Sequence, residues 1–403
     1  MSDQEGGAPG AGETTAADAW PGQAAMASLP APPTPAGFPA LLAHKALVYL
    51  RPDKIPAVLP HVDSVWSGMI LAGDGSARAL RRLQAARVTF PVLTDPEGYK
   101  DHTATCEAPF RLPNKDGMFP VTLGAVLDAQ LQSGAAAALT PTGYINAAET
   151  DVLKAAVTEF AALQRQDSIF LAPLDISLLG RGYFDQTAAI LSGLQAPVAL
   201  LLGCQGNPLD HSKDIIPNLR RLAARVPLIP VRTDFNGLDL LAHGALAAAI
   251  GTGGSVRHAV DPAEKHQAFN PGPAPSVLWP QLLTYFKGST IAELFGARPQ
   301  LAPSCPCAPC HGRLLTRFLG RDQQDEAIAH GVATWSPLAA QLLSAPSVRD
   351  RAEIWKACCE DAVVSHQAVL DMLLRLEGLR PQPSLSRWAA LPAWPASLPA
   401  PVA

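Results

Sequence analysis

Short apolar runs alternate with segments of helical character over most of the chain. Eight such runs recur, at residues 46–51, 65–73, 87–95, 135–145, 168–179, 197–206, 226–234 and 247–254. Helical segments such as 151–166 and 215–226 join most of them. Continuous apolar strands that alternate with helices are typical of a parallel sheet that is covered on both faces.

Eight strand–helix units predict an α/β fold of the (β/α)8 TIM-barrel type, which typically takes about 250 residues. An open, doubly wound sheet is the alternative. Because no GxGxxG motif follows the first apolar run, the sequence favours the barrel. We expect the barrel to occupy residues 41–268.

A cluster of cysteines follows the predicted barrel. Cys305, Cys307 and Cys310 form a C-x-C-x-x-C pattern, and thiolates are good zinc ligands that need a fourth partner. His311 would need a cramped turn to reach the same ion, whereas His330 lies in a helical pattern further on. We predict one Zn²⁺ held by the three cysteines and His330. Four protein ligands leave no open position, so the ion should be structural. Reduced cysteines in a proline-rich loop are the alternative.

Three further segments complete the predicted organisation. Residues 1–40 are rich in Ala, Gly, Pro and Thr, so we expect a disordered tail. Residues 269–378 should form a zinc-binding and helical subdomain. Residues 379–403 are proline-rich and should be extended, although Trp388 and Trp394 could dock.

Composition limits the partners and the compartment. The chain has 403 residues with a net charge of −4, which does not indicate a globally basic nucleic-acid binder but allows a local basic patch. No apolar run approaches the roughly 18 residues of a membrane span. The acidic, glycine-rich N-terminus is unlike a signal peptide. The seven cysteines, an odd number, fit a reducing compartment. We therefore expect a cytoplasmic protein without a membrane partner.

Polar residues follow the predicted strands, and a barrel carries its functional groups where the strands end. Asp95, Asp175 and Asp234 close the third, fifth and seventh strands, and Gln205 follows the sixth. These residues indicate a polar ligand in the barrel mouth. A strand-end aspartate also commonly caps the next helix, which is the alternative for each acid.

The turn after the eighth predicted strand is rich in glycine. Gly253 and Gly254 offer backbone N–H groups to an anion, and Arg257 adds a positive charge. This arrangement is compatible with a nucleotide, a nucleic-acid backbone or a phosphorylated metabolite. A tight turn that needs small residues is the alternative.

The barrel, the C-x-C-x-x-C cluster and the later helical histidine together resemble the tRNA-guanine transglycosylase family. The resemblance covers about residues 45–345 and is specific at the cysteine cluster. It implies a glycosyltransferase that binds or exchanges guanine or 7-deazaguanine in tRNA or DNA, with Asp95 recognising the purine-like base. It also allows a homodimeric or heterodimeric partner.

The catalytic region departs from the family pattern. The family's nucleophile is an aspartate just after the eighth strand, and aligning Arg257 with the family's arginine places Gly251 at that position. Base exchange needs a carboxylate that attacks the sugar. Either Asp234 or Asp175 has taken the role, or the chain is a non-catalytic subunit.

Two further expectations bear on the choice of function. Arg313, Arg317 and Arg321 recur every four residues, and on a helix they would form a positive stripe suited to phosphates. Outside the transglycosylase family, the alternative is a barrel enzyme that acts on a small phosphorylated substrate and has a purely structural zinc.

Overall fold

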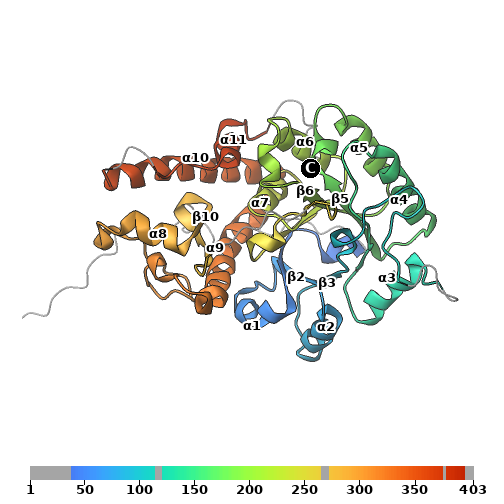
Figure 1. Cartoon of the computed structure of the whole chain (residues 1–403), viewed down its shortest axis with the longest axis horizontal. Coiled ribbons are helices and arrows are strands. Elements are labelled where there is room, and N and C mark those ends of the chain that lie inside the picture. The colour runs from blue at the N-terminus through green and yellow to red at the C-terminus, as the bar shows by residue number, and fades with distance from the viewer. Residues whose placement is uncertain (1–37, 114–119, 265–271, 375–377, 395–403) are drawn as a thin grey trace, which may run out of the picture.

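The structure is a computed structural model, and it describes residues 38–113, 120–264, 272–374 and 378–394. Figure 1 shows a barrel of strands and helices with a helical subdomain at its side. Of the predicted tail 1–40, residues 1–37 lie outside the described residues, and Phe38–Leu41 form a 3-10 turn. The predicted barrel end at residue 268 also lies outside them.

Eight parallel strands make one sheet in the order β7-β6-β5-β4-β3-β2-β1-β8. They are β1 Lys45–Leu50, β2 Ser67–Ala72, β3 Val92–Asp95, β4 Ala138–Leu139, β5 Ser168–Asp175, β6 Val198–Gly203, β7 Leu228–Val231 and β8 Ala247–Gly251. In the ladder, Val48 of β1 lies opposite Met69 of β2 and Ile250 of β8. A parallel bridge between Thr233 and Ile250 connects β7 to β8, so the sheet nearly closes. The predicted barrel is thereby confirmed.

Helices join the strands and cover the outside of the sheet. They are α1 Ile55–Val58, α2 Ser76–Ala85, α3 Leu123–Gln132, α4 Thr150–Ala162, α5 Phe184–Ser192, α6 Ile215–Ala223 and α7 Asn236–Ala242. In α6 the buried Ile215, Leu219 and Leu222 recur at helical spacing, which is why this segment lies against the sheet.

The barrel interior is a packed core, not a pore. One apolar cluster joins inward-facing residues of the strands, among them Ile70, Leu171 and Val231. Tyr49 and Tyr99 belong to the same cluster and are buried. Since Tyr49 lies near the end of β1 and Tyr99 follows β3, the core extends up to the mouth of the barrel.

The C-terminal subdomain has an apolar core of its own. It comprises the antiparallel hairpin β9 Ser276–Trp279 and β10 Thr284–Lys287, followed by α8 Gly288–Phe295, α9 Gln324–Ser344 and α10 Val348–Met372. Trp279, Phe295 and Phe318 are buried in its core. The long helix α9 packs on β9 and also on α1 and β1 of the barrel, which fixes the subdomain against the barrel. No helix among the described residues combines the length and apolarity needed to cross a bilayer.

The proline-rich end contains a helix, so the prediction of an extended segment was wrong for this part. Helix α11 covers Pro383–Ala390, and Trp388 packs edge-on against Trp355 of α10 with ring centroids 5.6 Å apart. Proline is well suited to the first turn of a helix, and burial of the tryptophan supplies apolar contact. Residues 395–403 lie outside the described part of the chain.

Candidate metal centre and barrel mouth

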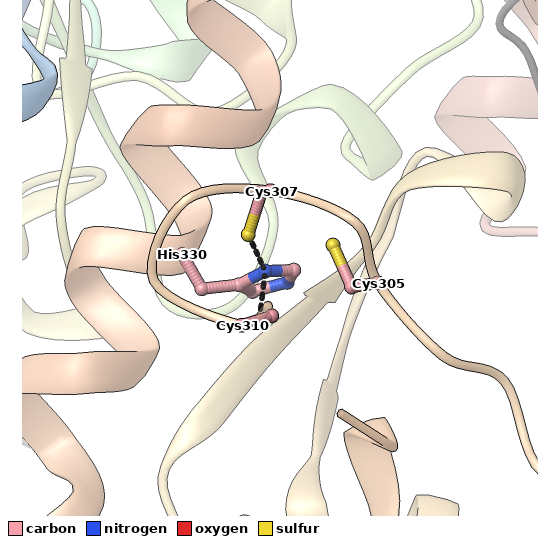
Figure 2. Close-up of side chains that lie close together, drawn as sticks. All are labelled: Cys305, Cys307, Cys310 and His330. Atoms are coloured by element: carbon pink, nitrogen blue, oxygen red, sulfur yellow. Dashed lines mark hydrogen bonds between the residues drawn. The ribbon is translucent and has the colours of Figure 1, made fainter. Parts of the chain in front are cut away.

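Three cysteines and one histidine meet beside the β9–β10 hairpin. Figure 2 shows Cys305, Cys307 and Cys310 on one loop and His330 reaching them from α9. Their ligand atoms all lie within 4.8 Å of one another, and all but Cys307 are buried. A tetrahedral site with metal–sulfur bonds of about 2.3 Å places its ligands roughly 4 Å apart. The four predicted ligands could therefore hold a metal ion with little adjustment.

The backbone of the cysteine loop aims the three thiols at one point. The N–H groups of Cys310 and His311 both donate to the Cys307 carbonyl oxygen at 2.9 Å, and Gly312 donates to the Cys305 carbonyl at 2.8 Å. His311 and Gly312 have φ angles of 50° and 79°, which turn the chain back on itself. The side chain of His311 is exposed and does not belong to the cluster.

His330 is oriented by the hairpin. Its Nε2 atom donates to the carbonyl oxygen of Leu278 in β9 at 2.7 Å. Its Nδ1 atom lies 3.3 Å from the sulfurs of both Cys307 and Cys310. Because a carbonyl accepts only from an N–H group, the neutral ring carries its proton on Nε2. Nδ1 then presents its lone pair to the centre of the cluster, as a metal ligand must.

The surroundings of Cys310 favour a negatively charged sulfur at this position. Nη2 of Arg317 donates to the sulfur of Cys310 at 3.2 Å. Hydrogen bonds among the three thiols lower the pKa of Cys310 and raise the pKa of Cys307, so that without a metal the negative charge would be concentrated on Cys310. Three thiolates around a divalent ion carry a net charge of about −1, which the nearby guanidinium offsets.

The predicted stripe of arginines does not form. Leu315–Arg317 and Arg321–Gln323 are separate 3-10 turns, so the four-residue spacing does not fall on one helix face. Arg313 and Arg317 both pair with Glu326 of α9, the latter at 2.8 Å. The prediction of a phosphate-binding helix was wrong because the loop that carries the cysteines continues into these turns.

Asp95 lies inside the barrel and not at its open mouth. It is 3% exposed, and its carboxylate accepts hydrogen bonds from Tyr49 Oη at 2.6 Å, Tyr99 Oη at 2.9 Å and the Glu97 N–H at 2.7 Å. Burial raises the pKa of this carboxyl above its usual 3.8. Asp95 thus ties the end of β1 to the turn after β3, and two tyrosines already engage the carboxylate that the sequence assigned to a ligand.

Asp175 caps the turn that follows β5, which was the alternative to a catalytic role for this residue. It accepts from the N–H of Ser177 at 2.9 Å at the start of the 3-10 turn Ile176–Leu179, and Tyr144 Oη donates to it at 3.2 Å. Gln205 and Gly253 lie in the loops after β6 and β8, but neither lines the cleft described next.

The structure brings together three of the predicted ligand-binding or catalytic residues. Asp234, Gly254 and Arg257 line a cleft of about 220 Å³ at the ends of β6, β7 and β8. Sequence reasoning missed other residues that line it, namely Asn207, Arg232, Asn236, His258 and Gln382. The position of Arg232 directly after β7 was a usable signal. No signal in the sequence pointed to Gln382, because it comes from the C-terminal end of the chain, far from the strands in sequence.

Gly251 occupies a position that is closed to side chains. A Cβ atom there would lie 2.1 Å from the carbonyl oxygen of Val256. The glycine is therefore required by the turn after β8, and this backbone cannot present a carboxylate from the position expected to hold a nucleophile.

Among known proteins, no family model and no curated protein matches the chain.

Gly251→Ala is expected to destabilise the chain by about 1–3 kcal/mol, since the clash is with a backbone carbonyl that cannot rotate away. Gly253→Ala is the matched control, because no atom lies within 4 Å of its Cβ position. We expect that variant to stay within about 0.5 kcal/mol of the wild type. Urea unfolding of both variants measures the difference, and equal stabilities would contradict the assignment.

Asp95 should make stability depend on pH in a defined direction. Its folded pKa lies above the usual value of 3.8, so in the window above 3.8 the folded chain binds more protons than the unfolded chain. The free energy of unfolding contributed by Asp95 therefore falls as pH rises through this window. Asp95→Asn removes the titration. Urea unfolding of both proteins across the window should show wild type losing stability relative to Asp95→Asn as pH rises, and a parallel pH dependence would refute the effect.

Proposed function

We propose that the chain is a tRNA-guanine transglycosylase-like protein that binds nucleic acid but does not exchange bases on its own. One combined observation carries this proposal. A barrel is followed by a Cys3His cluster in the order of that family, and the barrel's expected nucleophile position, Gly251, admits no side chain.

We further propose that the cluster holds one structural zinc ion. Three thiolates and an imidazole nitrogen are a donor set that suits zinc, and four protein ligands fill its tetrahedral sphere. The ion would tie the loop of Cys305, Cys307 and Cys310 to α9 through His330. It would therefore hold the subdomain together and leave any nucleic-acid chemistry to the barrel.

Two of the three predicted acids, Asp95 and Asp175, support the absence of base exchange. Asp95 is enclosed by Tyr49 and Tyr99, and Asp175 is engaged by Ser177 and Tyr144. Asp234 is the one of the three predicted acids that lines the open cleft, and one of its oxygens accepts the Asn236 N–H at 2.9 Å. A glycosyl-transfer step needs an acid that is free to attack the sugar, so Asp234 is the only one of these three that the mouth offers.

Binding of tRNA to the zinc-loaded chain tests the proposal. Filter binding at increasing salt should give an affinity that falls linearly in a double-logarithmic plot, because phosphate contacts release counterions. Single-stranded and duplex DNA of equal length serve as comparison ligands and report whether RNA is preferred. An absence of binding to tRNA and DNA at low salt would contradict the proposal.

A further inference from the structure

Helix α2 carries unpaired positive charge on its surface. Its sequence, Ser76–Ala85, contains three arginines and no acidic residue, whereas the whole chain has a net charge of −4. Arg78, Arg81 and Arg82 are exposed, and so is Arg87 directly beyond the end of the helix. Within the described part of the chain, none of these four side chains forms an ion pair or a hydrogen bond. A positive surface thus lies on a chain that is acidic as a whole.

The arginines lie on the outward side of α2 because its other side is buried. Leu80 and Leu83 are buried where the helix packs on β2 and β3. Arg78 precedes Arg81 and Arg82 by three and four residues, so these side chains are neighbours on the helix surface. Figure 1 shows α2 on the outside of the barrel, between α1 and α3. The positive row is therefore open to a partner.

Helix α10 shows how the chain pairs surface cations elsewhere. Arg349 has Glu353 four residues on at 3.3 Å, and Lys356 has Glu360 four residues on at 2.7 Å. No ion pair of the described residues joins the arginines of α2 to Asp74, the acid nearest to that helix in sequence. Like charges at this spacing repel and destabilise a helix. A partner of opposite charge would remove the repulsion on α2.

Arg87 occupies a position at which a helix commonly has glycine. Its φ angle of 54° lies in the left-handed region. The N–H of Val88 donates to the Leu83 carbonyl at 3.3 Å, and the N–H of Arg87 donates to the Gln84 carbonyl at 2.8 Å, which are the two bonds of a Schellman motif. Glycine adopts this conformation without the steric cost that arginine has. The backbone therefore gives no reason for an arginine here, whereas a charged partner does.

We propose that this arginine face, made of Arg78, Arg81, Arg82 and Arg87, binds the phosphate backbone of a nucleic acid. The inference rests on the proposed function and names a surface that the strand contacts. A helix of ten residues is about 15 Å long, and one strand of a DNA duplex has a phosphate about every 3.4 Å along its axis. About four phosphates therefore match the length of α2. Guanidinium groups bind phosphate oxygens in pairs and carry no sequence preference there.

The arginine face is continuous with the barrel mouth. Strand β2 ends at Ala72 and α2 begins at Ser76, so the helix starts at the mouth and runs along the outer wall of the barrel. A strand that enters the mouth can thus continue over the arginine face. Contacts of this kind would fix the position of the strand without reading its bases.

A membrane and an acidic protein fit this surface less well. A helix that binds a membrane surface inserts its apolar face into the lipid, but the apolar face of α2 is buried on the barrel. Protein interfaces depend on large apolar or aromatic anchors, and α2 exposes no large hydrophobic side chain. The charge of the arginine face is its main feature, which suits a polyanion.

Filter binding of tRNA and of duplex DNA at a series of salt concentrations tests the proposal on the full chain. The variant Arg78→Gln/Arg81→Gln/Arg82→Gln should bind about 10-fold more weakly or worse at low salt. Its double-logarithmic salt dependence should be shallower by about 2–3, because each lost phosphate contact removes nearly one released counterion. The comparison of tRNA with DNA shows which backbone the face prefers.

A second triple variant controls for the change in net charge. Lys154→Gln/Arg225→Gln/Arg349→Gln also removes three exposed cations, but from α4, the end of α6 and α10. This control should keep the wild-type salt dependence and an affinity within about 2-fold of the wild type. Equal weakening by the two triple variants would overturn the proposal, because it would show an effect of net charge alone.

Arg87→Gly separates loss of binding from loss of folding. Glycine suits the positive φ angle, so this variant should unfold at the wild-type temperature or above it. It should nevertheless bind nucleic acid more weakly, with a salt dependence shallower by about 1. Thermal unfolding of every variant is measured alongside its affinity.

The outcomes distinguish this inference from the proposed function. A wild type that binds tRNA or DNA, together with an Arg78→Gln/Arg81→Gln/Arg82→Gln variant that binds equally well, would overturn the arginine face and leave the proposed function standing. A wild type that binds neither would contradict the proposed function itself and the inference with it. Vesicles of equal parts phosphatidylserine and phosphatidylcholine are the third ligand. If the variant lost vesicle binding but kept nucleic-acid binding, the face would serve a membrane and the proposal would be wrong.

Discussion

Replacing Cys310 by serine is expected to release the bound ion and to lower the stability of the chain by several kcal/mol. Structural zinc sites contribute roughly 10–16 kcal/mol in zinc-finger peptides at neutral pH, and loss of one ligand forfeits a large part of this. Cys310 is fully buried, and its sulfur also accepts from Arg317 and lies next to His330. Serine would leave a weak ligand in the same place and would remove the sulfur that accepts from Arg317. Thermal unfolding together with elemental analysis measures both effects.

Cys106→Ser is the control for this experiment. Cys106 is exposed and lies outside the cluster, so its replacement should keep one equivalent of zinc and the wild-type melting temperature. Treatment of the wild type with a strong chelator should reproduce the Cys310→Ser result. A Cys310→Ser protein of unchanged stability, or purified wild type without metal, would show that the four residues are only a packed group of thiols and an imidazole.

Asp239→Ala is expected to cost about 3–5 kcal/mol, the second large effect. Asp239 is fully buried and accepts from Arg220 through Nη2 at 2.6 Å and Nε at 3.2 Å. It also accepts from Trp355 Nε1 of α10 at 2.9 Å, which links the barrel to the helical subdomain. Removal of the carboxylate leaves a buried guanidinium without its counter-charge and an indole N–H without its acceptor.

The neighbouring arginine on α6 supplies a matched control for Asp239→Ala. Arg221 pairs with Asp185 at 3.1 Å, but the Asp185 side chain is 81% exposed. An exposed pair of this kind contributes about 0–1 kcal/mol, so Asp185→Ala should be nearly neutral. Urea unfolding of the two variants compares a buried and an exposed pair in one protein. Similar losses from both would contradict the role assigned to Asp239.

Local patterns in the sequence were enough for the barrel and for the metal cluster. Each of the eight strands overlaps an apolar run, because burial on both faces requires continuous apolar residues. The cysteine spacing fixes three ligands within one loop, and the helical pattern around His330 predicts a fourth that a packed helix can deliver.

Local patterns could not predict which polar side chains of the barrel mouth are already engaged and which line the cleft. The carboxylate of Asp95 accepts a hydrogen bond from Tyr49, which lies 46 residues away in the sequence. A contact between residues so far apart cannot be recognised from a local sequence pattern. The cleft is likewise lined by Gln382, the residue before α11, and this helix docks through Trp388 on α10 and through Arg387 on the segment after β6. The prediction of a positive stripe from Arg313, Arg317 and Arg321 was wrong because it required one continuous helix. This segment instead forms separate 3-10 turns.

A trapping experiment on tRNA tests the absence of base exchange most directly. The zinc-loaded chain is incubated with labelled tRNA and excess guanine, and one half of the sample is passed through a native filter while the other is run on a denaturing gel. We expect retention of tRNA on the filter and no covalent band on the gel, since no side chain fits at Gly251. A covalent adduct that maps to Asp234 or Asp175 would contradict this and would make the chain an enzyme with a relocated nucleophile.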